Sequence, residues 1–316
     1  MIARLFRSGE HEQRIEDPKA FPREPGKSEL LWVDVERGDE SIDAGLKALG
    51  FESAAERLQD DIAPGVVRAD DVVHVVVLGL SMEGEGAQAS PSRVDLLARG
   101  NAVLTVRDEE VSGLGDLLEL VEGRSELGGL DAATFIALLI DGLIGAFFSE
   151  TDSIEHDIDQ LDDRALRAAP ERSFIRELTV LRRRVAILRR TLVPNRAAVA
   201  ALARPELALT PGGPDPWPAL LERLERAIDS VENARELLIG SFDLDMSRTA
   251  QRTNDVVRLL TVVSVTLLPA SVLAGIFGMN FQSPLFERSG TFVLAVAFIA
   301  TVSAVILLVA RWRRWL

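Results

Sequence analysis

The sequence predicts an α+β soluble part, a long helical stalk and two membrane-spanning helices at the C-terminus. Short β-branched runs alternate with helical patterns in the N-terminal third, and a helical period then continues with few interruptions. Two long uncharged apolar runs follow near the C-terminus. We therefore divide the 316 residues into an α/β domain at 1–125, a long-helix region at 126–255 and a two-span transmembrane domain at 256–316.

The α/β domain is inferred from apolar runs that are bounded by Gly, Asp or Asn, a pattern typical of buried strands. Gly113 and Gly115 form a GxG, but Leu118 stands where a dinucleotide loop needs its third glycine, so we interpret this stretch as a loop or helix start. The expected strands are residues 30–35, 72–80, 94–98 and 102–106, and the expected helices are residues 41–49 and 109–121.

Two long helices are expected next. Residues 131–168 place apolar side chains at helical spacing, their second half is rich in Asp and Glu, and Pro170 ends the pattern. Residues 172–203 form a second helical pattern rich in arginine. An acidic helix followed by a basic one predicts an antiparallel hairpin with charge pairs across it. The acidic segment, residues 150–163, is either a solvated helix face or a surface that attracts cations.

A stalk helix is predicted after the Pro- and Gly-rich linker at residues 211–218 (PGGPDPWP). From residue 219 to residue 277 only Gly240, Pro269 and Gly275 interrupt the helical pattern. One helix of that length would extend ~90 Å. Because an isolated copy would not support such a helix, we expect several copies side by side around a central axis, as a homo-oligomer.

Two membrane spans are predicted at the C-terminus. Residues 259–277 (LLTVVSVTLLPASVLAGIF) and 291–310 (TFVLAVAFIATVSAVILLVA) contain no charge. Each has about the 20 residues that cross ~30 Å of hydrocarbon. Pro269 within the first run is tolerated in a membrane helix.

The flanking charges predict the orientation of these spans. Arginines flank both runs on their outer sides, whereas the loop between them is neutral. The positive-inside rule then places both termini in the cytosol and the loop outside, in a multi-pass protein of the inner membrane. The N-terminus has no apolar core of signal-peptide length. The flanking arginines are Arg248, Arg252 and Arg258 before the spans and Arg311, Arg313 and Arg314 after them.

Composition excludes several functional classes. The net charge is −14, and residues 256–316 carry +4, so residues 1–255 carry −18 and would repel nucleic-acid phosphates. There is no cysteine, and the three histidines are far apart in sequence, which argues against a thiolate site or a histidine-based metal centre. No phosphate-binding loop or nucleophile–base pair is visible, so we expect neither an enzyme nor a bound cofactor.

A polar stripe runs along one face of the predicted stalk helix. Steps of 11 and 7 residues keep one face of a gently coiled helix. Polar groups in a span would be costly against lipid, which favours a water-filled lumen, although Ser and Thr can instead bond to their own helix backbone. The steps connect Asp243, Asn254, Thr261, Leu268 and Gly275, with Leu260, Ser264 and Ser271 nearby on the same side.

Residues 254–281 (NDVVRLLTVVSVTLLPASVLAGIFGMNF) resemble the first transmembrane helix and the GMN motif of the CorA family of divalent-cation channels. The motif, Gly278-Met279-Asn280, ends the penultimate span and is followed by a short loop, a second span and a basic, Trp-containing terminus. Upstream, residues 101–108 (NAVLTVRD) and 188–196 (LRRTLVPNR) also resemble family segments, and residues 30–35 resemble its first strand.

The resemblance implies a homopentamer with a cytosolic funnel, a pore-lining stalk helix and a second span outside it. It implies that Gly278, Met279 and Asn280 form the outer mouth, where Asn280 would hold a hydrated cation through its water shell. By position, Leu260 and Leu268 match an apolar constriction and Asn254 an inner polar ring. Asp243 matches an acidic, metal-attracting ring, and Arg311, Arg313 and Arg314 match a basic ring at the cytosolic side.

The sequence departs from the family pattern in three respects. Phe277 replaces the usual Tyr before GMN, and Gln282-Ser283-Pro284 replaces the acidic loop motif. Ala219 falls at or near the position of a regulatory aspartate, which leaves the gating ligand open.

The intact GMN and the lack of soft ligands favour passive import of Mg²⁺, with Co²⁺ or Ni²⁺ as further ions. A zinc transporter of the ZntB-like branch is the close alternative. A two-span sensor or scaffold without flux is the second alternative, but it would not explain the GMN motif or the polar stripe.

Overall fold

The computed structural model describes the chain except for residues 11, 23, 27, 60–62, 83–88, 109–110, 116, 118–124, 168–172, 208, 210–214, 280–289 and 313–316. The chain folds as two units, Met1–Ser241 and Phe242–Leu316. Helix α7 (Trp217–Gly278) contributes residues to both units.

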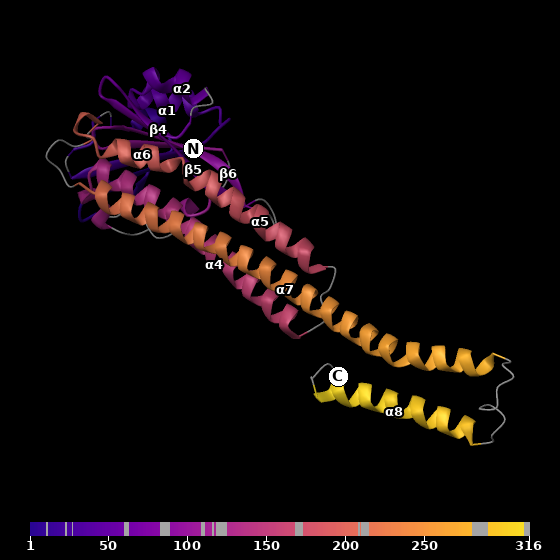
Figure 1. The fold of residues 1–316 in the computed structure, drawn as a ribbon. Coiled ribbons are helices and arrows are strands. Elements are labelled where there is room, and N and C mark those ends of the chain that lie inside the picture. Colours follow the sequence, from indigo (N-terminus) through magenta and orange to yellow (C-terminus); the bar gives the residue numbers. More distant parts are fainter. Residues whose placement is uncertain are drawn as a thin grey trace. The chain divides into compact units, whose positions relative to one another are not determined.

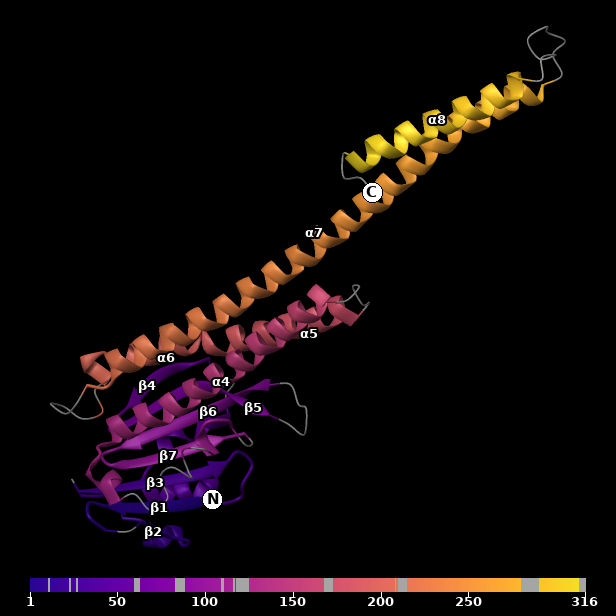
Figure 2. The ribbon, with the colours of Figure 1, turned by 90° about the horizontal axis from the view of Figure 1, so that it is seen from below.

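The first unit contains a mixed sheet of seven described strands in the order β2-β1-β3-β7-β6-β5-β4 (Figures 1 and 2). β3 and β7 pair in parallel, and the other neighbours are antiparallel. The strands are β1 (Ile2–Arg7), β2 (Gln13–Arg14), β3 (Glu29–Glu36), β4 (Gly65–Ala69), β5 (Val72–Met82), β6 (Ala89–Arg99) and β7 (Ala102–Arg107).

The four predicted strands lie within β3, β5, β6 and β7, whereas the sequence patterns did not indicate β1, β2 or β4. Buried Arg4 interrupts the apolar pattern of β1, and β2 has only two residues. The predicted helix at residues 109–121 lies mainly outside the described residues.

The sheet has an apolar core on each face. On one face lie α1 (Ile42–Leu49) and α2 (Ala55–Gln59), and on the other lie α4 (Ala132–Arg167), α5 (Ser173–Leu192), α6 (Asn195–Leu202) and the start of α7 (Figure 1). Trp32 of β3 meets Phe135 of α4 edge-on, with ring centroids 5.3 Å apart. Its indole N–H donates to Thr105 Oγ1 at 3.0 Å, so the buried ring keeps its polar group satisfied. Short 3-10 turns connect these elements at Pro18–Ala20, Glu52–Ala54, Ser125–Gly129 and Pro205–Leu207.

The turn at Gly113 packs directly against α4. Gly113 has a φ of 86°, and a Cβ built there would lie 2.2 Å from the carbonyl oxygen of Gly142. Only glycine allows both this backbone conformation and this close approach. Close packing of this turn against α4 therefore explains the glycine at position 113.

The predicted arginine-rich helix is two helices rather than one. α5 ends at Leu192 and α6 begins at Asn195, with Pro194 between them. Proline cannot donate a backbone hydrogen bond and clashes with the preceding turn, which explains the break. The expectation of a continuous helix at residues 172–203 was therefore wrong in this respect.

α4 and α5 form the antiparallel hairpin that the charge pattern predicted. The Arg184 guanidinium donates to Glu150 Oε1 at 3.0 Å and to Asp157 Oδ2 at 2.6 Å. Nearer the turn, Arg164 donates to Glu177 at 2.5 Å. Charge pairing across the hairpin is therefore confirmed at Arg184, where Glu150 is largely buried.

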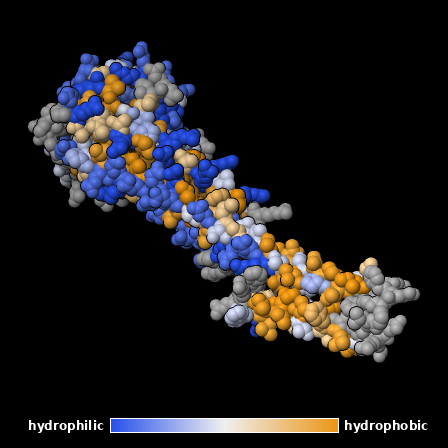
Figure 3. Space-filling model, viewed as in Figure 1, coloured by the Kyte–Doolittle hydropathy of each residue, from blue (hydrophilic) through white to orange (hydrophobic). Residues whose placement is uncertain are grey.

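The stalk prediction is confirmed by α7, a helix of 62 residues that contains Pro269. The second apolar run forms α8 (Thr291–Trp312), whose 22 residues extend about 33 Å. Among the described residues, two helices are long and apolar enough to cross a membrane, in α4 and α7, and the apolar stretch Val296–Trp312 is shorter. The α4 stretch is mostly buried beneath the sheet, so it is a core helix. In the second unit, apolar side chains cover α7 and α8 (Figure 3).

Candidate functional site

In the second unit, α8 runs alongside the C-terminal part of α7 (Figures 1 and 2). Val262 of α7 is 6% exposed and Ala310 of α8 is 5% exposed, whereas most of their neighbours are open. Thr266 and Leu273, one and three turns beyond Val262, are half-buried. The two helices therefore meet through one face of α7, centred on these three residues.

The predicted polar stripe lies on the opposite face of α7. At about 100° per residue, Ser264 lies ~200° around the helix from Val262, and Leu268 lies ~240° around. Leu260 and Leu268 are each 66% exposed, although both are leucines. The structure thus brings one set of predicted residues to a single open helix face: Leu260, Thr261, Ser264, Leu268, Ser271 and Gly275.

The hydroxyl of Thr261 donates to the Val257 carbonyl at 2.7 Å. Local bonding to the helix backbone, the alternative considered for these residues, therefore occurs at this position. The hydroxyl oxygen still has lone pairs that can accept a hydrogen bond or contact a cation. The chemistry of this face is consequently that of neutral oxygens interspersed with apolar groups.

Asp243 and Asn254 extend the stripe toward the N-terminal end of α7, and both are exposed. Within the described part of the chain, neither makes an ion pair or a side-chain hydrogen bond. They are therefore free to face solvent or another copy of the chain.

Only part of the predicted outer mouth and basic ring falls within the described residues. Gly278 is the last residue of α7, and Met279 follows it with 56% of its surface exposed. Arg311 is exposed in the last turn of α8. Asn280, Arg313 and Arg314 lie outside the described residues.

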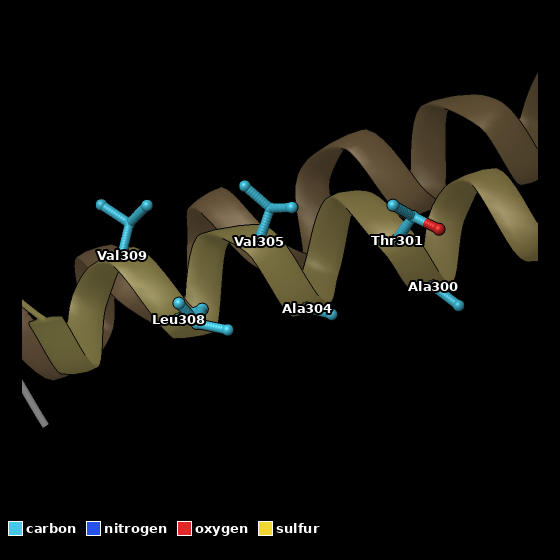
Figure 4. Close-up of a pocket in the computed structure, with 6 residues that line it drawn as sticks. All are labelled: Ala300, Thr301, Ala304, Val305, Leu308 and Val309. Atoms are coloured by element: carbon cyan, nitrogen blue, oxygen red, sulfur yellow. The ribbon is translucent and has the colours of Figure 1, made fainter.

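Among the described residues, no three His, Cys, Asp or Glu side chains are close enough together to hold a metal ion. A shallow groove on α8 is also a poor cation site, since Thr301 is its one polar side chain and its other lining residues are apolar. Figure 4 shows this groove, lined by Ala300, Thr301, Ala304, Val305, Leu308 and Val309.

Sequence patterns missed a buried charge network in the first unit. Asp95 of β6 is fully buried, and it accepts hydrogen bonds from His74 at 2.6 Å, from Arg93 at 2.7 Å and from Arg37. Burial alone would raise the pKa of Asp95, but these three donors together hold it below the usual value for a carboxyl.

Arg37 extends this network to two further elements. Its guanidinium donates to Asp108 at 2.5 Å and to the Leu58 carbonyl, near the end of α2, at 2.7 Å. The network thereby attaches α2 to the sheet. The alternation of Arg93 and Asp95 in an apolar strand was the one sequence signal that could have indicated it.

An α/β unit that is combined with two long helices whose apolar side chains are exposed is typical of membrane-anchored proteins. Within that class, the model of the family described as CorA-like Mg²⁺ transporter protein matches residues 27–312. The chain therefore belongs to this family of transporters.

Curated relatives carry related descriptions. The chain is 24% identical over 260 residues to the cobalt/magnesium transport protein CorA of Thermotoga maritima, covering 80% of this chain and 73% of that one. It is 27% identical to the divalent cation transporter CmaX of Pseudomonas aeruginosa, covering 91% and 88%. It is 22% identical to the zinc transport protein ZntB of Yersinia enterocolitica, covering 70% and 67%.

Solved structures share the fold along the full chain. The CorA magnesium transporter of Methanocaldococcus jannaschii matches with a TM-score of 0.78 at 19% identity, covering 100% of this chain and 99% of that one. Full-length CmaX matches with a TM-score of 0.72 at 23% identity, covering 100% and 98%. The predicted fold class, an α+β part with a long stalk and two C-terminal helices, is therefore confirmed.

Proposed function

We propose that the chain assembles as a homopentamer and forms a passive channel that imports Mg²⁺, with Co²⁺ and Ni²⁺ as further permeant ions. The observation that carries this proposal is the open stripe on α7, which lies opposite the face that contacts α8. Membership of a transporter family supports it. Around a central axis, α7 of each copy would line the pore and α8 would stand outside, against lipid.

Each part of the stripe has a role in this proposal. Leu260 and Leu268 form apolar rings that can close the pore by dewetting. Thr261, Ser264 and Ser271 supply hydroxyl oxygens between them, and Gly275 leaves room where the helices converge. At the cytosolic end, Asn254 forms an amide ring and Asp243 a carboxylate ring that attracts cations. Arg311, Arg313 and Arg314 surround the inner mouth.

The outer mouth is assigned to Gly278, Met279 and Asn280. Mg²⁺ loses its water reluctantly, so a ring of neutral amide oxygens suits capture of the hydrated ion through its water shell. A single chain supplies one such oxygen from each motif, and five copies supply a ring. The site thus needs the assembled oligomer.

Transport requires no chemical fuel in this mechanism. Moving two positive charges inward across 100 mV releases about 4.6 kcal/mol, twice the value for one charge. Basic residues flank both spans. They support a topology in which both termini lie in the cytosol.

Zn²⁺ is the second candidate ion, because some relatives are named zinc transport proteins. Against it, the chain has no Cys and only three His, and the stripe offers oxygen atoms, which suit a hard cation better.

The test is ion uptake into proteoliposomes under an inside-negative potential, with Mg²⁺ and Zn²⁺ compared for the native chain, Asn280→Ala and the matched loop control Gln282→Ala. We expect Mg²⁺ entry that is lost in Asn280→Ala and kept in Gln282→Ala. Entry of Zn²⁺ without Mg²⁺ would overturn the assigned ion. Absence of flux for both ions would overturn the channel and leave a non-conducting sensor.

A further inference from the structure

The outer face of α5 carries three arginines at heptad spacing, Arg176, Arg183 and Arg190, which we name the arginine stripe. All three are exposed, and among the described residues none of them makes an ion pair. The opposite face of α5 holds the buried Leu181, Val185 and other core residues, so the stripe points away from its own unit. Exposed Val180, 37% accessible, lies within the stripe and adds apolar contact area.

A complementary stripe lies on α4. Asp152, Glu155 and Asp159, which we name the acid stripe, have no ion-pair partner among the described residues. These three acids cannot form ion pairs with the arginines of α5 in their own chain. Arg184 of α5 contacts α4 at Asp157, and the acid stripe lies about 160–220° around α4 from that residue.

The two stripes also match in height. The pair Arg184–Asp157 fixes which residues of the antiparallel hairpin are level, and the pair Arg164–Glu177 fits the same register. In that register, Arg190 is level with residue 151, one residue from Asp152. Arg183 is likewise level with residue 158, one residue from Asp159.

The matching heights of the two stripes would allow them to meet between neighbouring copies in a closed ring. In a cyclic oligomer, all copies stand at the same height along the axis, and each copy uses two different patches, one toward each neighbour. The hairpin runs beside the N-terminal half of α7. α4 contacts it through Asp141–Arg223 at 2.8 Å and Asp162–Ser241 at 2.9 Å, and α5 contacts it through Arg189–Glu232. If this half of α7 follows the ring axis, so does the hairpin, and its levels are preserved between copies.

We propose that the α4–α5 hairpin is an interface between neighbouring copies, in which the arginine stripe of one copy pairs with the acid stripe of the next. Arg190 meets Asp152 of the next copy, and Arg183 meets Asp159. This inference rests on the homo-oligomer of the proposed function, and it goes beyond it by locating a contact outside the pore. The hairpin ring ties the soluble parts together around the axis.

The chain lacks cysteine, so disulfide cross-linking needs no altered background. The test compares three double variants of the full chain in membranes under mild oxidation. Two are in register, Arg190→Cys with Asp152→Cys and Arg183→Cys with Asp159→Cys. The third, Arg176→Cys with Asp152→Cys, uses the same two faces but is displaced by 13 residues, or about 20 Å.

We expect both in-register variants to give a ladder of cross-linked masses that reduction abolishes, and the displaced variant to give none. A bridge within one chain would leave the mass unchanged, and a disulfide requires Cα atoms within about 7 Å, so the ladder reports contacts between copies. Equal cross-linking of all three variants, or none in the in-register pairs, would overturn the interface.

Charge exchange provides a second test. Arg183→Glu with Arg190→Glu should lower the yield of oligomers trapped by an amine-reactive linker at limiting protein concentration, by about two- to five-fold for each exposed pair lost. Adding Asp152→Arg and Asp159→Arg should restore the yield. If the arginine reversals instead act only in vesicles that contain phosphatidylglycerol, and the cross-links are absent, the stripe binds anionic lipid and the proposal is wrong.

Failure here is distinguishable from failure of the channel. The mass of the native chain in detergent shows whether an oligomer exists at all. An oligomer without in-register cross-links refutes only the hairpin interface. Cross-links in a chain that transports no ion refute only the channel, and a monomer refutes both.

Discussion

The side-chain amide of Asn195, the first residue of α6, forms two hydrogen bonds with the backbone of Leu78 in β5. The Leu78 N–H donates to Asn195 Oδ1 at 2.8 Å, and Asn195 Nδ2 donates to the Leu78 carbonyl at 2.8 Å. β4 begins its pairing with β5 at Val76, so Leu78 lies beyond the end of its partner strand. The amide replaces the missing strand at this point and attaches α6 to the sheet.

We expect Asn195→Ala to destabilise the first unit strongly. It would leave a partly buried N–H and a partly buried C=O of Leu78 without these partners, at a cost of up to about 1–3 kcal/mol for each group. Thermal unfolding of the full chain in detergent, followed by fluorescence, measures the effect, and Asn233→Ala on an exposed position of α7 is the control. An unfolding temperature of Asn195→Ala equal to that of the control would show that water or a rearranged strand replaces the amide.

The pH dependence of stability provides a second prediction. The folded pKa of Asp95 lies below the usual value, so its contribution is present above an unfolded pKa of about 4 and is lost as pH falls through the folded pKa. Asp95→Asn should cost about 3 kcal/mol at neutral pH, because it leaves Arg37 and Arg93 without their shared charge. It should also flatten the loss of stability below about pH 4. Unfolding midpoints in denaturant between neutral and acidic pH measure both effects.

Asp34 provides a control in which the pKa shift has the opposite sign to that of Asp95. Burial raises its pKa, against the opposing effect of Arg107, whose Nε lies 3.1 Å from the carboxylate. A carboxyl with a raised folded pKa contributes stability at low pH that is lost as pH rises through the interval from the unfolded to the folded value. Asp34→Asn should therefore steepen the acid destabilisation relative to Asp95→Asn. Identical slopes for the two variants would contradict the assignment.

The charge pairs of the hairpin give a third prediction. Arg184 is 18% exposed and bonds to Glu150, Asp157 and Ser153 of α4. Arg184→Ala should lower the free energy of unfolding by about 1–3 kcal/mol, because it leaves the largely buried Glu150 without its partner. Arg182→Ala, which removes an exposed arginine of the same helix, should change it by less than about 0.5 kcal/mol. Protease susceptibility of the hairpin, measured alongside unfolding, should rank the two variants in the same order.

Sequence patterns predicted the elements whose information is local. The uncharged runs indicated the exposed part of α7 and α8, and the β-branched runs indicated β3 and β5–β7. The pairing of Asp95 with His74, Arg93 and Arg37 was not predictable from spacing, because its members come from separate strands and a loop. The same holds for Asn195 and Leu78, which are 117 residues apart. β1 was missed because Arg4, buried among Ala3, Leu5 and Phe6, makes the strand look polar.

For the candidate site, helical period alone was enough to group the stripe on one face, since that grouping depends only on residue spacing. What spacing could not give is which face of α7 contacts α8. The burial of Val262 supplies that information and places the stripe on the opposite, open side. Ion flux tests the assignment of this open side to a pore.

Leucine positions on α7 allow that test to be made with adjacent residues. Leu260 is 66% exposed on the stripe, and Leu259 is 55% exposed but lies about 60° from Val262, on the side toward α8. If Leu260 forms an apolar ring that excludes water, Leu260→Ala widens and wets the pore, and the initial rate of Mg²⁺ uptake into proteoliposomes should rise several-fold. Leu259→Ala removes the same atoms from a surface outside the pore and should leave the rate unchanged.

The comparison is sharp because both variants lose equal apolar area from neighbouring positions of one helix, so general effects on insertion or helix stability should affect them alike. Protein incorporated per vesicle is measured for each, and rates are expressed per chain. Equal rates for the two variants would show that the open face of α7 does not line the permeation path. A higher rate for Leu259→Ala alone would place the path on the side of α7 that faces α8.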